Sequence, residues 1–441
     1  MTRPQPLDDW TRQVAAAFPQ LSRPQATVLA LYSFGMFLAR RCGLNSVVTA
    51  LVPLLGQGFH TLRSRLQELY QPASAKSGRR RAELDVTTCF APLLAWVLRG
   101  WRSPRLALAL DATSHGDRLT ALSIGVVYRG QAIPVAWKIL PANVPHPWEP
   151  EWRALVRAFA GTVPAGYTVI VMTDRALYAR WLYREIRSLG WHPVMRITRQ
   201  SKFRARGSRR AVAVTELAPR PGCRWQGRGT AFPAHPERRL ECTLMACWGE
   251  GYDEPWFLVT DLDPDESEAL WYGMRSWIEG GYRLLKSGGW EWQATRMTDP
   301  GRAERLWLVL AVATRYVVAI GGEADEAEFA NATVPEPAGR PAESAPARPP
   351  ARGGRRRPRA RRREAAERPA EARAPRRRPS GTKWRLVGIF AQGLAVLVSL
   401  LVNGHELPRP SWRPEAWLEI RTEVGAPPQQ PPTPIPKNPS L

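Results

Sequence analysis

The chain has 441 residues, which is enough for two or three domains with buried cores. Its formal net charge is +24, and a charge of this size indicates a polyanionic partner. Thirteen arginines and three glutamates in residues 351–380 supply ten of these charges, so the rest of the chain is itself basic at +14. Nucleic acid fits both parts, whereas a membrane surface fits only the Arg-rich part.

The five cysteines are odd in number and scattered, and the first residues show no signal peptide. Both features lead us to expect a protein of the reducing cytoplasm. Cys242 and Cys247 are separated by four residues, with Cys223 and His235 upstream. This spacing permits a zinc site, although cysteine pairs at such loose spacing usually bind no metal.

Apolar residues recur at helical spacing through residues 1–95, in runs such as ATVLALYSFGMFLA and LNSVVTALVPLLG. This periodicity, broken at proline and glycine, predicts a helical N-terminal domain over residues 1–100. The segment FHTLRSRLQELY places Arg63 and Arg65 on one of these helices. That helix either binds DNA or packs as part of a helical cap.

From Leu106 the pattern changes to strands. LALALD is a short apolar run that ends at Asp111, and two further β-rich runs follow around a turn at Gly130. A helical segment, the strand TVIVMTD ending at Asp174, a second helix and the strand WHPVMRIT come next. Three antiparallel strands followed by alternating helices and strands predict an α/β fold with a ribonuclease H-like core.

Residues 200–260 interrupt this order with Arg-, Gly- and Pro-rich sequence and short strands such as LECTLMACW. We expect a β-rich insertion here. DPDES then offers capping residues for a following helix, and helical periodicity resumes at 303–320. The α/β domain is therefore expected to span residues 101–320.

The composition changes again at residue 321, where acidic, then Pro/Ala-rich, then Arg-rich sequence predicts a disordered linker over residues 321–383. Residues 386–404 are almost uncharged and long enough to span a membrane, but two glycines and a glutamine interrupt them. We expect a helix that docks on the core, within a C-terminal helical segment at 384–420. A polar tail, 421–441, ends the chain.

Asp111 and Asp174 end the first and fourth predicted strands, which are neighbours in the expected order, so both carboxylates should lie at one edge of the sheet. Glu279, from a later helix, would add a third. Clustered carboxylates repel one another unless a cation neutralises them, and oxygen ligands favour Mg²⁺ or Mn²⁺. Two such ions about 4 Å apart can activate the attacking oxygen and stabilise the leaving oxygen in phosphoryl transfer.

The stretch around Glu279 has a spacing of its own. On a helix, Tyr272, Arg275, Glu279 and Lys286 fall within roughly one 60° stripe at about 100° per residue. A charged stripe is also typical of an ordinary solvated helix face. The two upstream aspartates favour the catalytic interpretation.

These segments resemble a known family. LALDAT and VIVMTDRALYARWL are similar to the sequences around the two aspartates of bacterial insertion-sequence transposases of the Asp-Asp-Glu (DDE) class, and YGMRSWIEGGYRLLK is similar to their Tyr-Arg-Glu-Lys signature. The resemblance covers roughly residues 10–320 and returns at 386–420. The Arg-rich stretch between these parts departs from the family pattern.

The resemblance implies that Asp111, Asp174 and Glu279 bind two Mg²⁺ or Mn²⁺ ions. It implies cleavage and strand transfer at the inverted-repeat ends of an insertion sequence, on double-stranded DNA, with target DNA as the second substrate. It further implies a synaptic homodimer that cuts in trans, with a DNA hairpin intermediate in the closest relatives. The expected location is the cytoplasm, at the nucleoid when DNA is bound, with no membrane partner.

The resemblance also assigns DNA contacts. Tyr272, Arg275 and Lys286 would hold phosphates near the transposon end, which suits a guanidinium fork and a point-charge ammonium. Trp256 occupies the place of a tryptophan that stacks on a flipped base, and its alternative role is that of a core aromatic. Two other functions stay open: a DNA-binding protein with a decayed catalytic site, and a ribonuclease H-like nuclease that does not transpose.

Overall fold

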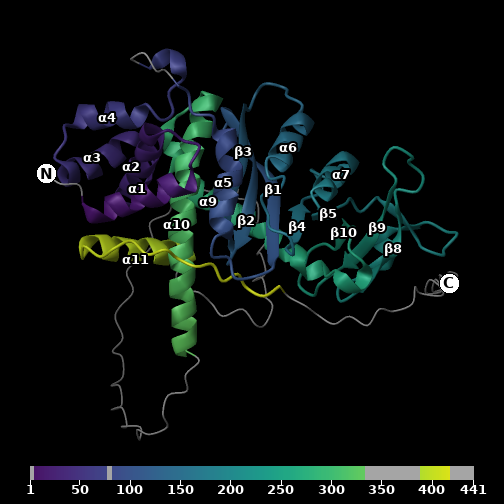
Figure 1. The fold of residues 1–441 in the computed structure, drawn as a ribbon. Helices are drawn as coiled ribbons and strands as arrows, with labels where there is room; N and C mark the ends of the chain where they lie inside the picture. The colour runs from purple at the N-terminus through teal and green to yellow at the C-terminus, as the bar shows by residue number, and fades with distance from the viewer. Residues whose placement is uncertain (1–3, 77–81, 333–387, 418–441) are drawn as a thin grey trace, which may run out of the picture.

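The structure, a computed structural model, describes residues 4–76, 82–332 and 388–417. It is a mixed α/β protein with a helical N-terminal region and one large sheet, as the sequence predicts (Figure 1). The Arg-rich segment 352–378, the polar tail and most of the predicted linker lie outside the described residues.

Five α-helices build the described part of the N-terminal region. They are α1 (Gln5–Ala17), α2 (Arg23–Ala39), α3 (Leu44–Leu55), α4 (Phe59–Gln67) and α5 (Phe90–Leu98). Ser22 and Gln25 form a capping box at the start of α2. This helix is buried along almost its whole length, and the Trp10 indole donates to Ser33 Oγ in its interior. Arg63, on α4, donates to Asn45 and Gln67 within this region.

The sheet has ten strands among the described residues, in the order β3-β2-β1-β4-β5-β10-β9-β8-β6-β7. The strands are β1 (Arg105–His115), β2 (Leu119–Tyr128), β3 (Gln131–Pro141), β4 (Thr168–Thr173), β5 (His192–Arg196), β6 (Lys202–Ala205), β7 (Val212–Ala213), β8 (Arg224–Ala231), β9 (Leu240–Cys247) and β10 (Trp256–Thr260). The β1–β4 and β4–β5 pairs are parallel, and the other pairs are antiparallel.

Residues 200–260 are β-rich, as expected, but they do not form a separate unit. β10 pairs with β5, so the strands of this segment continue the sheet that begins with β1–β5. The sequence did not reveal this continuity, because pairing between distant strands leaves no local signal.

Helices cover both faces of the sheet. The long helix α10 (Pro300–Ala332) lies between the N-terminal helices and the sheet, and α6 (Trp148–Arg157) and α7 (Arg180–Ser188) lie on the opposite side (Figure 1). The short helix α8 (Val214–Leu217) follows β7, and α9 (Trp277–Lys286) packs on β1–β3.

One helix in the described part of the chain, Pro300–Ala327 within α10, is long and apolar enough to cross a membrane. Its apolar window is 94% buried inside the protein, and the α2–α3 pair passes the same test only as a pair bent by 92°. α10 is thus the central core helix of the fold.

The predicted start of the linker, at residue 321, is wrong, because α10 continues to Ala332. The acidic residues that suggested disorder lie on this helix and have partners elsewhere in the fold. Glu323 accepts hydrogen bonds from the Ser411 amide and hydroxyl, Asp325 pairs with Arg129 at 2.6 Å, and Glu326 pairs with Arg413 at 2.8 Å.

Helix α11 (Ile389–Val402) docks against α10, as expected for the apolar run. Two glycines permit the approach: a Cβ at Gly321 would overlap the Ile389 carbonyl, and one at Gly393 would overlap the Val317 carbonyl. Gly393, which interrupts the apolar run in the sequence, is therefore a contact point between the two helices.

Candidate active site

The two aspartates lie together at one edge of the sheet. In the parallel β1–β4 pair, Leu110 is opposite Thr173, so Asp111 and Asp174 both follow the last paired position. Asp111 does not end its strand, because β1 continues to His115 and pairs Asp111 with Ser123 of β2. Asp174 follows β4, and its Oδ1 accepts hydrogen bonds from the Ala176 and Leu177 amides, both at 3.0 Å.

Arg275 joins all three predicted catalytic carboxylates. Its Nη2 lies 2.9 Å from Asp111 Oδ2 and 3.8 Å from Asp174 Oδ2, and its Nη1 lies 3.2 Å from Glu279 Oε1. The arginine side chain is only 14% exposed. The structure thus gathers these four residues into one cluster, called the carboxylate cluster below.

The single helix predicted over 272–286 is wrong. Residues Ala269–Ser276 form a 3₁₀ helix, η4, which carries Tyr272 and Arg275, and α9 begins at Trp277. Glu268 caps the start of η4 by accepting from the Leu270 amide at 2.9 Å. With three residues per turn in η4, Tyr272 and Arg275 lie above one another rather than on the stripe of a continuous α-helix.

Tyr272 does not present its hydroxyl to solvent. The residue is 5% exposed, and its Oη donates to the Thr173 carbonyl at 3.2 Å. Burial raises the pKa of Tyr272 to about 12. The phenol therefore holds the end of β4 next to Asp174 as a neutral hydrogen-bond donor.

α9 lies unusually close to β3 because of two consecutive glycines. A Cβ at Gly281 would overlap the Ala132 carbonyl, and one at Gly280 would come within 2.8 Å of the Gly130 carbonyl. Close approach of this helix brings Glu279 to the sheet edge where the two aspartates lie. These glycines fall within the signature stretch, but their role is visible only once the helix is placed on the sheet.

Lys286 and Tyr282 both face β1 from α9. Lys286 Nζ donates to Thr113 Oγ1 and to the Ser114 carbonyl, each at 2.7 Å, and burial lowers the pKa of the lysine. Tyr282 was not singled out in the sequence. Its Oη donates to the Asp111 carbonyl and lies 2.8 Å from Ser123 Oγ, and burial raises its pKa strongly. Its position four residues before Lys286 is the signal that places both side chains on one face.

Trp256 opens β10 and contacts the signature directly. Its ring is edge-on to Tyr272 at 5.3 Å and to Tyr252 at 5.1 Å. Trp256 is half-buried, whereas Tyr252 is 40% exposed. The aromatic contacts agree with a packing role, although Trp256 is not fully buried.

The charge of the carboxylate cluster is unbalanced. Burial raises the pKa of Asp111, while the Arg275 guanidinium opposes that shift. One guanidinium faces three carboxyl groups, so the cluster retains excess negative charge when all three are ionised. Such a site favours binding of a further cation or protonation of one of its carboxylates.

The donor set fits a hard divalent ion, because all three side chains offer oxygen. In the described part of the chain, however, no group of three or more His, Cys, Asp and Glu side chains lies together in a metal-binding arrangement. Arg275 itself lies among the three carboxylates and makes the contacts that a metal would make. A metal would require Arg275 to turn away. Among the described residues, Cys242 and Cys247 likewise belong to no group of three or more side chains that could hold a metal, and all five cysteines are free thiols.

Comparisons with known proteins give little further information. No protein family matches the sequence, and no curated protein matches it. Among solved structures, a piggyBac transposase in a synaptic complex with hairpin DNA is similar at a TM-score of 0.30 and 10% sequence identity. The alignment covers 70% of this chain and 77% of that chain. A similarity this low establishes neither a shared fold nor a shared function.

Proposed function

We propose that this chain is a DDE transposase of the insertion-sequence type, which cleaves DNA and transfers strands at inverted-repeat ends. The observation that carries the proposal is the carboxylate cluster, in which Asp111, Asp174 and Glu279 surround one guanidinium. The strand order β3-β2-β1-β4-β5, with β1, β4 and β5 parallel, supports a ribonuclease H-like core beneath that cluster.

In this proposal Asp111, Asp174 and Glu279 hold two Mg²⁺ or Mn²⁺ ions. When bound, these ions polarise the scissile phosphate, activate the attacking oxygen and stabilise the leaving oxygen. Two tyrosines act as positioning residues. Tyr282 fixes the backbone at Asp111, and Tyr272 fixes the backbone beside Asp174, each through a carbonyl oxygen.

The basic side chains hold the DNA. Arg275, once released from the carboxylates, offers a planar fork for a phosphate, and Lys286 offers a point charge at the same sheet edge. The excess positive charge of the chain supplies attraction that does not depend on sequence. Double-stranded DNA, at terminal repeats and at a target, is thus the proposed substrate, and a homodimer the proposed assembly.

The test uses DNA that carries the inverted repeats flanking the gene. Asp111→Asn, Asp174→Asn and Glu279→Gln should each abolish Mg²⁺-dependent nicking and strand transfer while end binding persists, because the basic side chains, and not the carboxylates, contact the phosphates. Asp117→Asn, an equal change at an exposed turn next to β1, is the matched control and should retain activity.

Other outcomes decide between the alternatives. Sequence-preferring DNA binding without nicking in any metal would favour a DNA-binding protein with a decayed site. Nicking without strand transfer would favour a nuclease. Mixing Glu279→Gln chains with Lys286→Ala chains tests the dimer, because partial recovery of cleavage requires one chain to hold the DNA that another cuts.

A further inference from the structure

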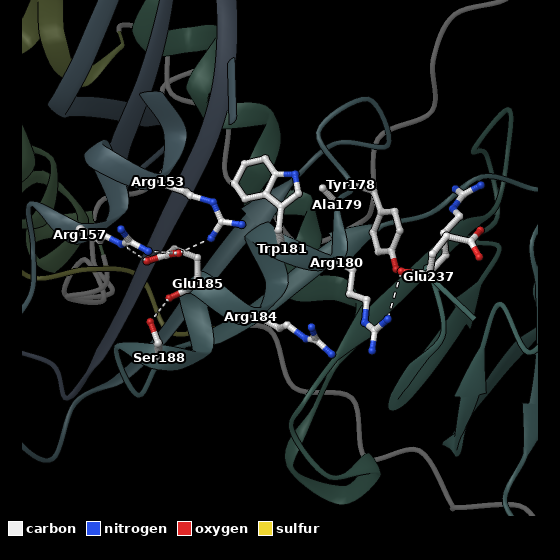
Figure 2. Close-up of a pocket in the computed structure, with 11 residues that line it drawn as sticks. Arg153, Arg157, Tyr178, Ala179, Arg180, Trp181, Arg184, Glu185, Ser188 and Glu237 are labelled. Carbon is white, nitrogen blue, oxygen red and sulfur yellow. Dashed lines mark hydrogen bonds and ion pairs between the residues drawn. The ribbon is translucent and has the colours of Figure 1, made fainter. Parts of the chain in front are cut away.

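A basic site lies away from the carboxylate cluster residues themselves, on helices α6 and α7. A cavity of about 650 Å³ opens between α6, α7 and the loop that joins β8 to β9 (Figure 2). Five arginines line it: Arg153, Arg157, Arg180, Arg184 and Arg238. Only two carboxylates, Glu185 and Glu237, line it with them, so the cavity is cationic.

Two of the arginines are held by a buried carboxylate. Glu185 has a side chain that is 6% exposed, and it accepts from Arg153 Nη1 at 2.6 Å and from Arg157 Nε at 2.5 Å. The Arg153 guanidinium also stacks on the Trp181 ring at 4.9 Å, as Figure 2 shows. These contacts fix the α6 wall of the cavity and compensate part of its charge.

The wall formed by α7 has fewer hydrogen-bond acceptors than donors. Arg180 Nη1 donates to the Pro236 and Glu237 carbonyls, both at 3.1 Å, and so anchors the loop. Its Nε is buried without a hydrogen-bond partner in the described structure, and the same holds for Tyr178 Oη. Arg184 is exposed, and none of the ion pairs between described residues includes it. Buried polar atoms rarely stay unsatisfied, so this wall suits an added acceptor.

The chemistry of these groups points to phosphate. Arginine forks match phosphate oxygens in pairs, and Arg180 and Arg184, one turn apart on α7, are about 6 Å apart along the helix axis. Two phosphates of one strand could contact such a pair. Residues 175–177, whose turn is held by Asp174 Oδ1, join the cavity rim at Tyr178 to the carboxylate cluster.

We propose that this cavity binds the backbone phosphates of a DNA segment that lies next to the bond being cut, outside the carboxylate cluster. The proposal rests on the proposed function, which it deepens by adding a second DNA contact surface. It assigns Arg180, Arg184 and Arg238 to phosphates and leaves Arg153 and Arg157 as structural partners of Glu185.

The test measures how duplex affinity depends on salt, with a mixed-sequence DNA duplex and no divalent metal. Each phosphate contact contributes about 0.9 to the slope of log K against log salt on B-form DNA. The double variant Arg184→Ala/Arg238→Ala should therefore lower the magnitude of the slope by about 2. The matched control Arg102→Ala/Arg409→Ala removes two exposed arginines elsewhere and should leave the slope unchanged.

An unchanged slope in the cavity variant, or an equal change in the control, overturns the proposal. The proposal is also overturned if inorganic phosphate binds the cavity while the cavity variant shows the same salt slope for duplex binding as the wild type, because the site would then bind a free anion. Thermal unfolding of each variant confirms that folding is retained. Nicking by the wild type is measured in parallel: absence of nicking together with the expected slope change overturns only the enzymatic proposal, and nicking with no slope change overturns only the cavity proposal.

Discussion

Among the described residues, Arg275 is the cation that contacts all three carboxylates of the carboxylate cluster, and replacing it by alanine removes those contacts. Asp111 and Arg275 side chains are 17% and 14% exposed, so the pair is largely desolvated. Breaking such a pair from one side costs about 3–5 kcal/mol when it is fully buried. Because some solvent reaches this pair, we expect the free energy of unfolding of metal-free Arg275→Ala to fall by about 3 kcal/mol.

Magnesium should reverse much of that loss. In the wild type an ion has to displace the guanidinium, whereas in Arg275→Ala the three carboxylates are free to bind it. At a concentration a hundredfold above Kd, a ligand that binds only the folded state adds about 2.7 kcal/mol. The stabilisation by Mg²⁺ should thus be larger in the variant than in the wild type.

Thermal or denaturant unfolding with and without Mg²⁺ measures both effects. Arg196→Ala is the matched control, because Arg196 is 17% exposed and pairs with the single carboxylate Glu254 at 2.7 Å. It should lose stability without gaining a response to Mg²⁺. If Arg275→Ala responds to Mg²⁺ no more than Arg196→Ala does, the three carboxylates do not form a metal site and the reasoning fails.

Three further predictions concern other parts of the chain. Gly321→Ala should separate α11 from α10 and destabilise the protein by about 3 kcal/mol, the upper end of the cost of overpacking. The control Gly388→Ala, whose new Cβ would meet nothing within 4 Å, should leave stability unchanged, and denaturant unfolding curves measure both effects. Trp256→Ala should slow hairpin formation more than first-strand nicking if the ring stacks on a base, worth about 1–3 kcal/mol, and equal loss at both steps would indicate packing only. Deleting residues 352–378 should flatten the salt dependence of DNA binding and keep the preference for the cognate end, and a collapse of that preference would show that the segment reads sequence.

Local patterns were enough to predict the helical N-terminal region and the first five strands. Mostly apolar runs mark these strands because both faces of this part of the sheet are covered, which buries β2 along its whole length and β4 along almost all of it. The meeting of Asp111 and Asp174 followed from strand order alone. The continuation of the sheet through β10 did not, because β5 and β10 are separated by a long, mostly polar segment whose pairing has no local signature.

The contacts of Arg275 and Tyr272 in the carboxylate cluster could not be predicted from the sequence for a different reason. A stripe at helical spacing assumes one continuous α-helix, and the change from η4 to α9 at Trp277 breaks that assumption. Arg275 and Tyr272 consequently point to the sheet edge, where each finds a partner on β1 or β4. The arginine cavity was also not predicted, since its members come from α6, α7 and a distant loop.

The position of Arg275 couples metal binding to DNA binding in the proposed function. In the described structure its guanidinium neutralises the carboxylates, whereas in the proposed complex it holds a phosphate. It cannot do both with the same donors, so a phosphate that draws Arg275 away exposes the carboxylates to a cation. Metal and DNA would then each favour binding of the other, and thermodynamic linkage makes that preference equal in both directions. On this view the protein without DNA keeps its carboxylates paired, and a metal-loaded site forms where a phosphate is present to be cut.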